Sequence, residues 1–284
     1  MIDLDSIAGF FPEPLRAPAF RKHILKEYVE CLALEWIARS PWASRLAFIG
    51  GTNLRLVSGI DRFSDGLDFD CKAFSREDFA AFTDALVRHL VRNGLPATAK
   101  AAESARLSAY HRSILFPGFL KDCGLSAFPE ERFMMKIEAQ DQGVPYPRAT
   151  AAVNHCGFFF PVPVPPAPVL CAMKLSALLS RAKGRDFYDA VFLLQRTAPD
   201  CAFLARKHPG LDTLPAVLDA LARKAAATNL ALKRRDVEHL LFRRKTASRV
   251  TDFPLFLRTL SPENLTRKAS PFPGGEGADK VETP

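Results

Sequence analysis

Residues Phe48 to Lys72 read FIGGTNLRLVSGIDRFSDGLDFDCK, and this stretch decides the fold. The apolar run from Leu46 to Ile49 predicts a strand, and the Gly-Gly-Thr that follows predicts a turn into a short helix. Asp68 and Asp70 then alternate with apolar residues, which is the pattern of a second strand. The stretch therefore predicts two strands joined by a glycine turn and a helix, with two carboxylates on one strand face.

The glycine pair, Gly50 and Gly51, has the composition of a phosphate-binding turn. Without a Cβ, backbone N–H groups can approach phosphate oxygens, and a helix that begins there adds its free N–H groups. We expect the N–H groups of Gly51 and Thr52 to contact a triphosphate, helped by the hydroxyls of Thr52 and Ser64. Such a turn commonly only joins a strand to a helix, but the acids that follow favour phosphate binding.

Asp68 and Asp70 are the candidate metal ligands. Acids two residues apart on a strand point to one face, where they can share Mg²⁺ or Mn²⁺. Leu67 and Phe69 flank Asp68 and predict a buried opposite face, whereas the alternative is an acid in solvent on an edge strand. A phosphate-binding turn followed by metal-binding carboxylates predicts phosphoryl or nucleotidyl transfer.

This stretch resembles motif I of the AbiEii/AbiGii nucleotidyltransferase toxins, within the DNA polymerase β-like nucleotidyltransferase superfamily. The family pattern is approximately GGT-x-L-R, then R-F-S-E-D-L-D-F. The resemblance implies a nucleotide site that includes Gly50 and Arg62. One position departs from the pattern, because Gly66 stands where the family has its first metal-binding Asp. The matching residues are Gly50, Gly51, Thr52, Leu54, Arg55, Arg62, Phe63, Ser64, Leu67, Asp68 and Phe69.

Three accounts of Gly66 stay open at the level of sequence. Asp68 and Asp70 can form the metal pair, although two residues along a strand span roughly 6.6 Å, so the metals or nucleotide would shift. Alternatively, glycine permits a bulge that turns Asp65 onto the catalytic face. In the third account the site is degenerate and binds nucleotide without turnover.

A second block, Cys171 to Asp189, reads CAMKLSALLSRAKGRDFYD and resembles the family's K-L-x-A-L helix followed by R-x-K-x-R-D-x-x-D. Lys174 and Arg181 are seven residues apart on the expected helix and share a face, from which both can reach polyphosphate. The resemblance implies catalytic roles for Lys174 and Asp186, with Asp186 positioning Lys174 or the base. Asp186 and Asp189 also fit the N-cap and N3 positions of the next helix, and both roles can hold at once.

Glu138 is a candidate third carboxylate for the metal site. In polymerase β-like enzymes a later, neighbouring strand supplies the acid that orients or deprotonates the attacking hydroxyl, and Glu138 lies in the expected strand Phe133–Gln140. An exposed strand glutamate without a catalytic role fits this position equally well.

Hydrophobic periodicity places the remaining elements. Pro161 to Pro168, PVPVPPAP, predicts a stiff extended linker, which is favoured over an SH3-type PxxP ligand. The expected helices span residues 17–40, 75–94, 169–181, 186–196, 214–228, 235–242 and 253–260, and the expected strands span 45–49, 67–71, 105–115, 133–140 and 158–164.

Composition restricts the class of protein. The 284 residues carry 48% hydrophobic residues and a net charge of +8, which suits a soluble globular chain able to bind nucleic acid. Six scattered cysteines form neither a disulfide scaffold nor a zinc pattern. No apolar run reaches eighteen residues, and acids stand where a signal peptide would be basic, so we expect a cytoplasmic protein without a membrane partner.

We therefore expect an α/β (α+β) polymerase β-like core with a small mixed sheet over residues 1–168, a helical region over 169–260 and a disordered tail over 261–284. The resemblance implies a metal-dependent nucleotidyltransferase that moves a nucleotidyl group from an NTP to a hydroxyl of RNA such as tRNA. It also implies the toxin of a toxin–antitoxin pair. The alternatives are a catalytically degenerate nucleotide- or RNA-binding module and an enzyme that modifies a protein or small molecule.

Overall fold

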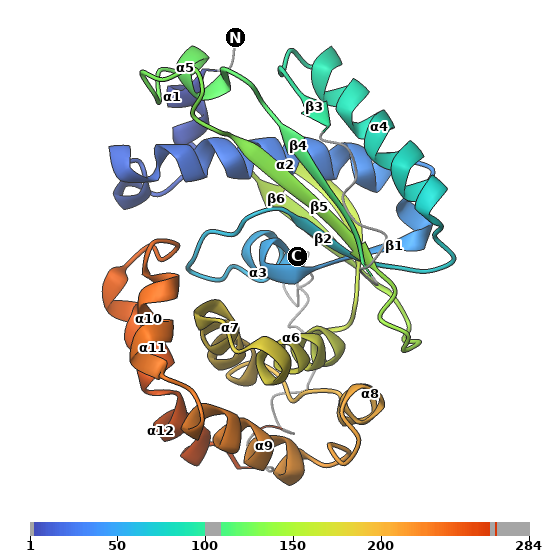
Figure 1. Cartoon of the computed structure of the whole chain (residues 1–284), viewed down its shortest axis with the longest axis vertical. Helices are drawn as coiled ribbons and strands as arrows, with labels where there is room; N and C mark the ends of the chain where they lie inside the picture. Colours follow the sequence, from blue (N-terminus) through green and yellow to red (C-terminus); the bar gives the residue numbers. More distant parts are fainter. Residues whose placement is uncertain (1–2, 100–108, 262–264, 266–284) are drawn as a thin grey trace, which may run out of the picture.

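A computed structural model describes residues 3–99, 109–261 and 265, and it contains a five-stranded mixed sheet with helices on it (Figure 1). The strand order is β1-β2-β5-β4-β3, in which β2 pairs with β5 in parallel and the other pairs are antiparallel. The predicted α/β class with a small mixed sheet is confirmed. The sheet strands are β1 (Leu46–Ile49), β2 (Leu67–Cys71), β3 (Thr98–Ala99), β4 (Tyr110–Leu115) and β5 (Met134–Gln140).

Helices from both halves of the chain surround this sheet, and the helices after residue 166 form the lower half of Figure 1. The first half contains α1 (Leu4–Ala8), α2 (Arg21–Arg39), α3 (Gly50–Leu56), α4 (Arg76–Arg92) and α5 (Phe119–Asp122). The second half contains α6 (Ala167–Arg181), α7 (Gly184–Leu194), α8 (Cys201–Lys207), α9 (Leu214–Ala226), α10 (Leu230–Glu238), α11 (Ser248–Thr251) and α12 (Phe253–Arg258).

The start of α4 shows how local sequence sets an element. Ser75 accepts a hydrogen bond from the Asp78 N–H (3.1 Å), and the Asp78 carboxylate accepts one from the Ser75 N–H (3.1 Å). This reciprocal capping box provides acceptors for two N–H groups at the helix start that have no hydrogen-bond partner within the helix. The predicted helix start at Ser75 is therefore confirmed.

The expected proline linker over residues 161–168 is wrong, because its first half belongs to β7, a strand that was itself expected at 158–164, and its end belongs to α6. A separate hairpin pairs β6 (Ala149–His155) with β7 (Phe158–Val164), and α6 begins at Ala167. Pro161 and Pro163 are two residues apart, so both missing N–H groups lie on one edge of a two-stranded ribbon, where a proline does not remove a ladder hydrogen bond.

Other elements also differ from the predicted ones in their bounds. The helix expected at 235–242 is α10 at Leu230–Glu238, and neither α8 nor β6 was expected. The strand expected at 105–115 is described only as Tyr110–Leu115, and most of the expected tail lies outside the described residues. No helix in the described part of the chain combines the length and apolar character needed to cross a membrane.

Two hydrophobic cores pack on either side of the Gly-Gly-Thr helix. One core gathers α2, α4 and the sheet, and the other gathers α6 to α12. Leu54 of α3 and Ile60 after it belong to the second core, although the chain around them belongs to the first. The segment that follows is also tied to the C-terminal helices, because the Phe63 N–H donates to the Leu240 carbonyl (2.8 Å). The division at residue 168 stays a prediction.

Candidate active site

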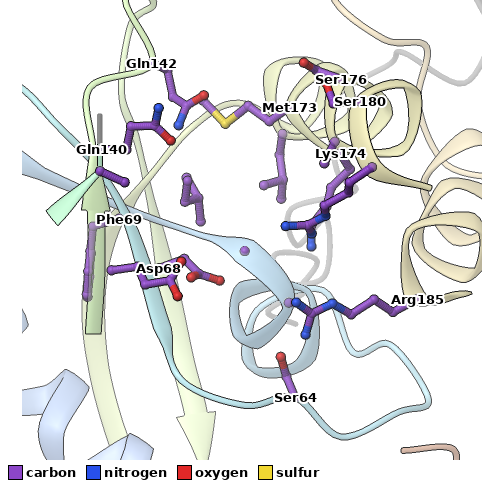
Figure 2. Close-up of a pocket in the computed structure, with 18 of the residues that line it drawn as sticks. Ser64, Asp68, Phe69, Gln140, Gln142, Met173, Lys174, Ser176, Ser180 and Arg185 are labelled. Carbon is purple, nitrogen blue, oxygen red and sulfur yellow. The ribbon is translucent and has the colours of Figure 1, made fainter. Parts of the chain in front are cut away.

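A cavity of about 520 Å³ opens between the sheet and α6, and it collects residues from both halves of the chain (Figure 2). Six Lys or Arg side chains and three carboxylates line it, so its walls favour an anionic ligand. The charged lining residues are Arg62, Asp65, Asp68, Lys136, Glu138, Lys174, Arg181, Arg185 and Lys207.

Gly50 and Gly51 must be glycines in this arrangement. Gly50 has φ +84°, and a Cβ there would overlap the Asp68 carboxylate. A Cβ on Gly51 would overlap the Ser64 hydroxyl and approach the Arg62 guanidinium to 3.0 Å. The glycine pair therefore lets the start of α3 press against Asp68 and Ser64, and Gly50, Gly51, Ser64 and Asp68 all line the cavity.

Asp68 lies beside Glu138 at the cavity wall. The two residues are register partners on the parallel strands β2 and β5, which places both carboxylates on one face. Burial, followed by the charge of Glu138, raises the pKa of Asp68 to about 6. His111 on β4 lies 3.4 Å from the Glu138 carboxylate. The structure thus brings together Asp68 and Glu138, both of which were predicted from sequence.

Asp70 is placed differently. It is 1% exposed and outside the cavity lining, and its carboxylate accepts hydrogen bonds from the Gln142 N–H (2.8 Å) and the Tyr146 hydroxyl. Both carboxylate oxygens therefore have protein partners. The expected Asp68–Asp70 metal pair stays a prediction, but the geometry gives Asp70 a role in fixing the chain after β5.

The backbone of Gly66 is held from two sides. Its N–H donates to the buried Glu30 carboxylate (2.6 Å), and its carbonyl accepts from the Thr52 hydroxyl (2.5 Å). Gly66 has φ +88°, and a Cβ there would lie 2.7 Å from the Lys136 carbonyl oxygen. An Asp at this position would require the chain to move, so glycine suits this backbone.

Thr52 and Asp65 are committed to other contacts. The Thr52 side chain is fully buried and its hydroxyl binds Gly66, so the expectation that this hydroxyl helps to bind triphosphate does not fit the geometry. Asp65 borders the cavity, but Lys26 lies 2.7 Å from its carboxylate. Burial raises the pKa of Asp65, but the charge of Lys26 outweighs it and holds this pKa below its usual value.

Lys174 is fixed by Asp189. The Asp189 carboxylate is fully buried and binds Lys174 Nζ at 2.9 Å together with two nitrogens of Arg62, at 2.7 and 2.8 Å. Against the effect of burial, Arg62 and Lys174 hold the pKa of Asp189 below its usual value. Asp186 was expected to position Lys174 or the base, and for Lys174 this expectation is not met; Arg62, which is itself fully buried, binds the same Asp189 carboxylate.

Asp186 instead positions Arg181. It accepts two hydrogen bonds from that guanidinium (3.0 and 2.9 Å) and one from the Lys183 N–H (3.0 Å). Asp186 is the N3 residue of α7 and Asp189 lies inside the helix, so the expected N-cap and N3 pair is shifted. The expected double role of Asp186, helix capping and site support, fits this geometry.

Several lining residues were not among the residues predicted for the site. Arg185 enters the cavity from the first turn of α7, and Met173, Ser176, Ala177 and Ser180 line it from α6. The α6 residues recur at intervals of three or four around Lys174, so helical periodicity could have identified them. Gln142 and His208 come from loop and helix-end positions that carry no such pattern.

Known proteins share this arrangement of elements. A family model described as "Nucleotidyl transferase AbiEii toxin, Type IV TA system" matches residues 32–260. The fold is similar to MenT4, a nucleotidyltransferase toxin from Mycobacterium tuberculosis H37Rv, with TM-score 0.55 and 17% identity over 95% of this chain and 94% of that chain. It is also similar to JHP933 from Helicobacter pylori, with TM-score 0.50 and 16% identity over 87% of this chain and 94% of that chain. Comparison with curated proteins finds no match.

Proposed function

The chain belongs to the AbiEii nucleotidyltransferase toxin family, and we propose that its cavity transfers a nucleotidyl group from an NTP to an acceptor hydroxyl. The observation that supports this proposal most strongly is the meeting of Asp68 and Glu138 with Lys174, Arg181 and Arg185 in one cavity. Cationic side chains suit a polyphosphate, and the carboxylates suit the reacting end of it.

Asp68 and Glu138 fit a divalent metal site. Within the described residues no three His, Cys, Asp or Glu side chains are grouped to hold a metal by themselves. Two carboxylates are nevertheless the usual protein contribution to Mg²⁺ bound with nucleotide, because substrate phosphates and water complete the coordination. When bound, Mg²⁺ or Mn²⁺ would neutralise charge on the phosphates. We favour the Asp68–Glu138 pair over the Asp68–Asp70 pair, since Asp70 lies outside the lining.

The residues at the two ends of the cavity suggest which way a bound nucleotide would point. Ser64 and Arg185 lie toward one end, Lys174 lies between, and Gln140, Gln142 and Met173 lie toward the other end (Figure 2). We place the β- and γ-phosphates at the end that contains Ser64 and Arg185. The α-phosphate then lies near Asp68, and the base extends toward the amide side chains.

In the transfer step the acceptor oxygen attacks the α-phosphorus, pyrophosphate leaves, and the acceptor proton moves to a nearby base. Glu138 is the candidate base where Asp68 alone holds the metal, because its side chain is 48% exposed at the cavity wall and is open to an incoming acceptor; as a metal ligand it would leave this proton to solvent. Asp189 holds Lys174 in place and Asp186 holds Arg181, and these two cations stabilise the charge of the leaving pyrophosphate.

RNA is the proposed acceptor, with a tRNA 3′ end as the specific candidate. A cationic rim supports it: the charge of the neighbouring Arg185, followed by burial, lowers the pKa of Lys183, and the charges of Arg181 and Lys136 lower it further. The net charge of +8 agrees with a phosphate backbone as partner. The family description also supports a cognate antitoxin as a partner, which a neighbouring reading frame for a small regulator would provide.

The test is transfer of label. The protein is incubated with each α-labelled NTP, Mg²⁺ or Mn²⁺ and total RNA, beside Asp68→Asn and a surface control, Asp219→Asn. We expect label on RNA with the wild type and the control, and its loss with Asp68→Asn. Label on protein or a small molecule would redirect the acceptor assignment. Tight NTP binding without transfer to any acceptor would instead support the degenerate module.

A further inference from the structure

A second cluster of reactive groups lies away from the cavity, where α2 packs against the turn between β6 and β7. Glu27 of α2 contacts His155 Nε2 at 2.6 Å, and the Tyr28 ring lies 5.5 Å from the Phe158 ring. Cys31 follows Glu27 by one helical turn on the same face of α2, and Cys156 follows His155 at the end of β6. These two contacts hold the segment that carries Cys156 against the face of α2 that carries Cys31, and each thiol is among the groups that shift the pKa of the other.

The surroundings of the two cysteines differ in a way that divides their roles. The hydrogen bond from Cys31, with a further one from His155, lowers the pKa of Cys156 to about 7, although burial opposes this. Burial lowers the pKa of His155, but its bonds to Cys156 and Glu27 raise it to about 9. Arg55 binds the same Glu27 carboxylate at 2.7 Å. These contacts favour the thiolate form of Cys156, and the buried Glu27 carboxylate lies against the imidazole of the neighbouring His155.

We propose that Cys156 and Cys31 form an oxidisable dithiol, in which Cys156 attacks a peroxide and Cys31 resolves the product as a disulfide. In the first step the Cys156 thiolate takes one oxygen from hydrogen peroxide, giving a sulfenic acid and hydroxide. In the second step the Cys31 thiol attacks that sulfur, the S–S bond forms and water leaves. The two thiols are oxidised, the peroxide is reduced, and a thiol reductant restores the starting state.

The disulfide would join α2 to the β6–β7 hairpin. On the same helix Glu30 binds the Gly66 backbone and Glu27 binds Arg55 of α3, so the cross-link would lie on a helix that contacts both α3 and the segment before β2. This inference does not depend on the nucleotidyl transfer proposed above, because the chemistry belongs to the two cysteines.

Access sets the class of oxidant. Cys31 is fully buried and Cys156 is 4% exposed, so a water-sized peroxide suits the site and a bulky maleimide does not. Cys171 is a matched control: it is also fully buried, but burial raises the pKa of its thiol and no cation is among the groups that shift it. We expect Cys171 to stay reduced under the same conditions.

The experiment treats the reduced full-length protein with hydrogen peroxide, unfolds it in a thiol-blocking reagent and maps the peptides by mass spectrometry. The expected product is a Cys31–Cys156 linked peptide that dithiothreitol cleaves, formed equally in Cys171→Ser. In Cys31→Ser, Cys156 should accumulate sulfenic acid that dimedone captures. In His155→Gln, oxidation should slow about tenfold or more, because the thiolate fraction falls about tenfold per unit of pKa.

Circular dichroism and thermal melting establish that each variant is folded before oxidation. Recovery of both cysteines as blocked thiols in the peroxide-treated wild type would overturn the proposal. Equal oxidation of Cys171 would overturn it as well, because reactivity would then be unrelated to the Glu27–His155 contact. If Cys31 reacts in Cys156→Ser as fast as in the wild type, the assigned roles of the two thiols are wrong.

Discussion

At Gly66 a single residue changes which carboxylates are available to the site, while the fold of the chain stays the same. The family pattern has a metal-binding Asp there, and this chain has a glycine whose N–H and carbonyl are bound by Glu30 and Thr52. Positive φ and the nearby Lys136 carbonyl oxygen leave little room for a side chain. Backbone contacts hold the position beside Asp68, and Glu138 provides the second carboxylate at the cavity wall.

Restoring the family residue tests this account. We expect Gly66→Asp to destabilise the protein and to leave nucleotidyl transfer no higher than in the wild type. Gly59→Asp is the matched control, since Gly59 also has positive φ (+75°), but no described residue beyond its chain neighbours lies within 4 Å of where a Cβ would stand. Denaturant unfolding should show Gly66→Asp less stable than Gly59→Asp by about 1–3 kcal/mol, the usual cost of overpacking. Higher activity in Gly66→Asp would contradict the account.

The two candidate partners of Asp68 can be separated by substitution. We expect Glu138→Gln to lower the rate of nucleotidyl transfer by about 10²–10⁴-fold, the usual contribution of a general base. Asp70→Asn should keep the rate within about tenfold and instead lower stability by about 1–3 kcal/mol, because it weakens the bonds to Gln142 and Tyr146. The reverse result would restore the Asp68–Asp70 pair expected from sequence.

Glu30 gives a prediction for pH. Burial raises the pKa of its carboxyl well above the usual value, so the stability that its protonated form contributes is present at low pH and is lost as pH rises. Glu30→Gln keeps an oxygen for the Gly66 N–H and removes the ionisation. We therefore expect the Tm of Glu30→Gln relative to the wild type to increase from pH 4.5 upward. A difference that is independent of pH would contradict this assignment.

At the scale of elements, α6 and α7 supply Lys174, Arg181 and Arg185 to the cavity, and two aspartates of α7 bind the first two of these cations. Asp189 inside α7 holds Lys174 and Arg62 in a buried network, and Asp186 at the start of α7 holds Arg181 near solvent. A buried charge without its partner is costly, whereas the loss of a half-exposed pair is not. Substitution of Asp189 and substitution of Asp186, which is three residues earlier, should therefore affect stability and activity differently.

Asp189→Asn should destabilise the fold by about 3–5 kcal/mol, because two buried cations lose their common partner. Asp186→Asn should cost less stability, since the Arg181 side chain is 45% exposed, but it should raise KM for NTP by freeing that guanidinium. Urea unfolding and steady-state kinetics on both variants measure these effects. Equal loss of stability would show that the two pairs are not distinct in the way their burial implies.

At the scale of the whole molecule, the cavity joins two hydrophobic cores. The sheet supplies Asp68 and Glu138, and the C-terminal helices supply Lys174, Arg181 and Arg185. The cores are also fastened away from the cavity, where Asp61 accepts hydrogen bonds from Tyr188 (2.8 Å) and Arg249 (2.7 Å). A ligand in this cavity contacts both halves at once, so its binding should stabilise the whole molecule.

We expect NTP with Mg²⁺ to raise the Tm, by an amount that corresponds to about 2.7 kcal/mol at a ligand concentration one hundred times Kd. Removal of the metal with EDTA should abolish transfer and most of this increase, and should leave the Tm of the free protein nearly unchanged. Differential scanning fluorimetry measures both. A large drop in the Tm of the free protein on chelation would show that a metal supports the fold itself.

Much of the architecture follows from local patterns. The strands around the glycine turn, the capping box at Ser75 and the K-L-x-A-L helix were predicted where the structure has them, because apolar periodicity and capping act over a few residues. The proline-rich segment was misjudged, because whether a proline disturbs a strand depends on which edge its missing N–H faces. Pairing with β6 decides that, and sequence does not contain it.

By itself, the sequence determined the family and the mixed α/β fold, and it predicted Asp68, Glu138, Lys174 and Arg181 as site residues, all of which line one cavity, since short motifs and periodic faces carry that information. Only the tertiary structure decided which of these residues lie next to each other. It paired Lys174 with Asp189, Arg181 with Asp186 and Asp68 with Glu138, and it turned Asp70 and Thr52 to structural contacts. The reason is physical: each carboxylate's role depends on which distant cation, hydroxyl or strand lies beside it.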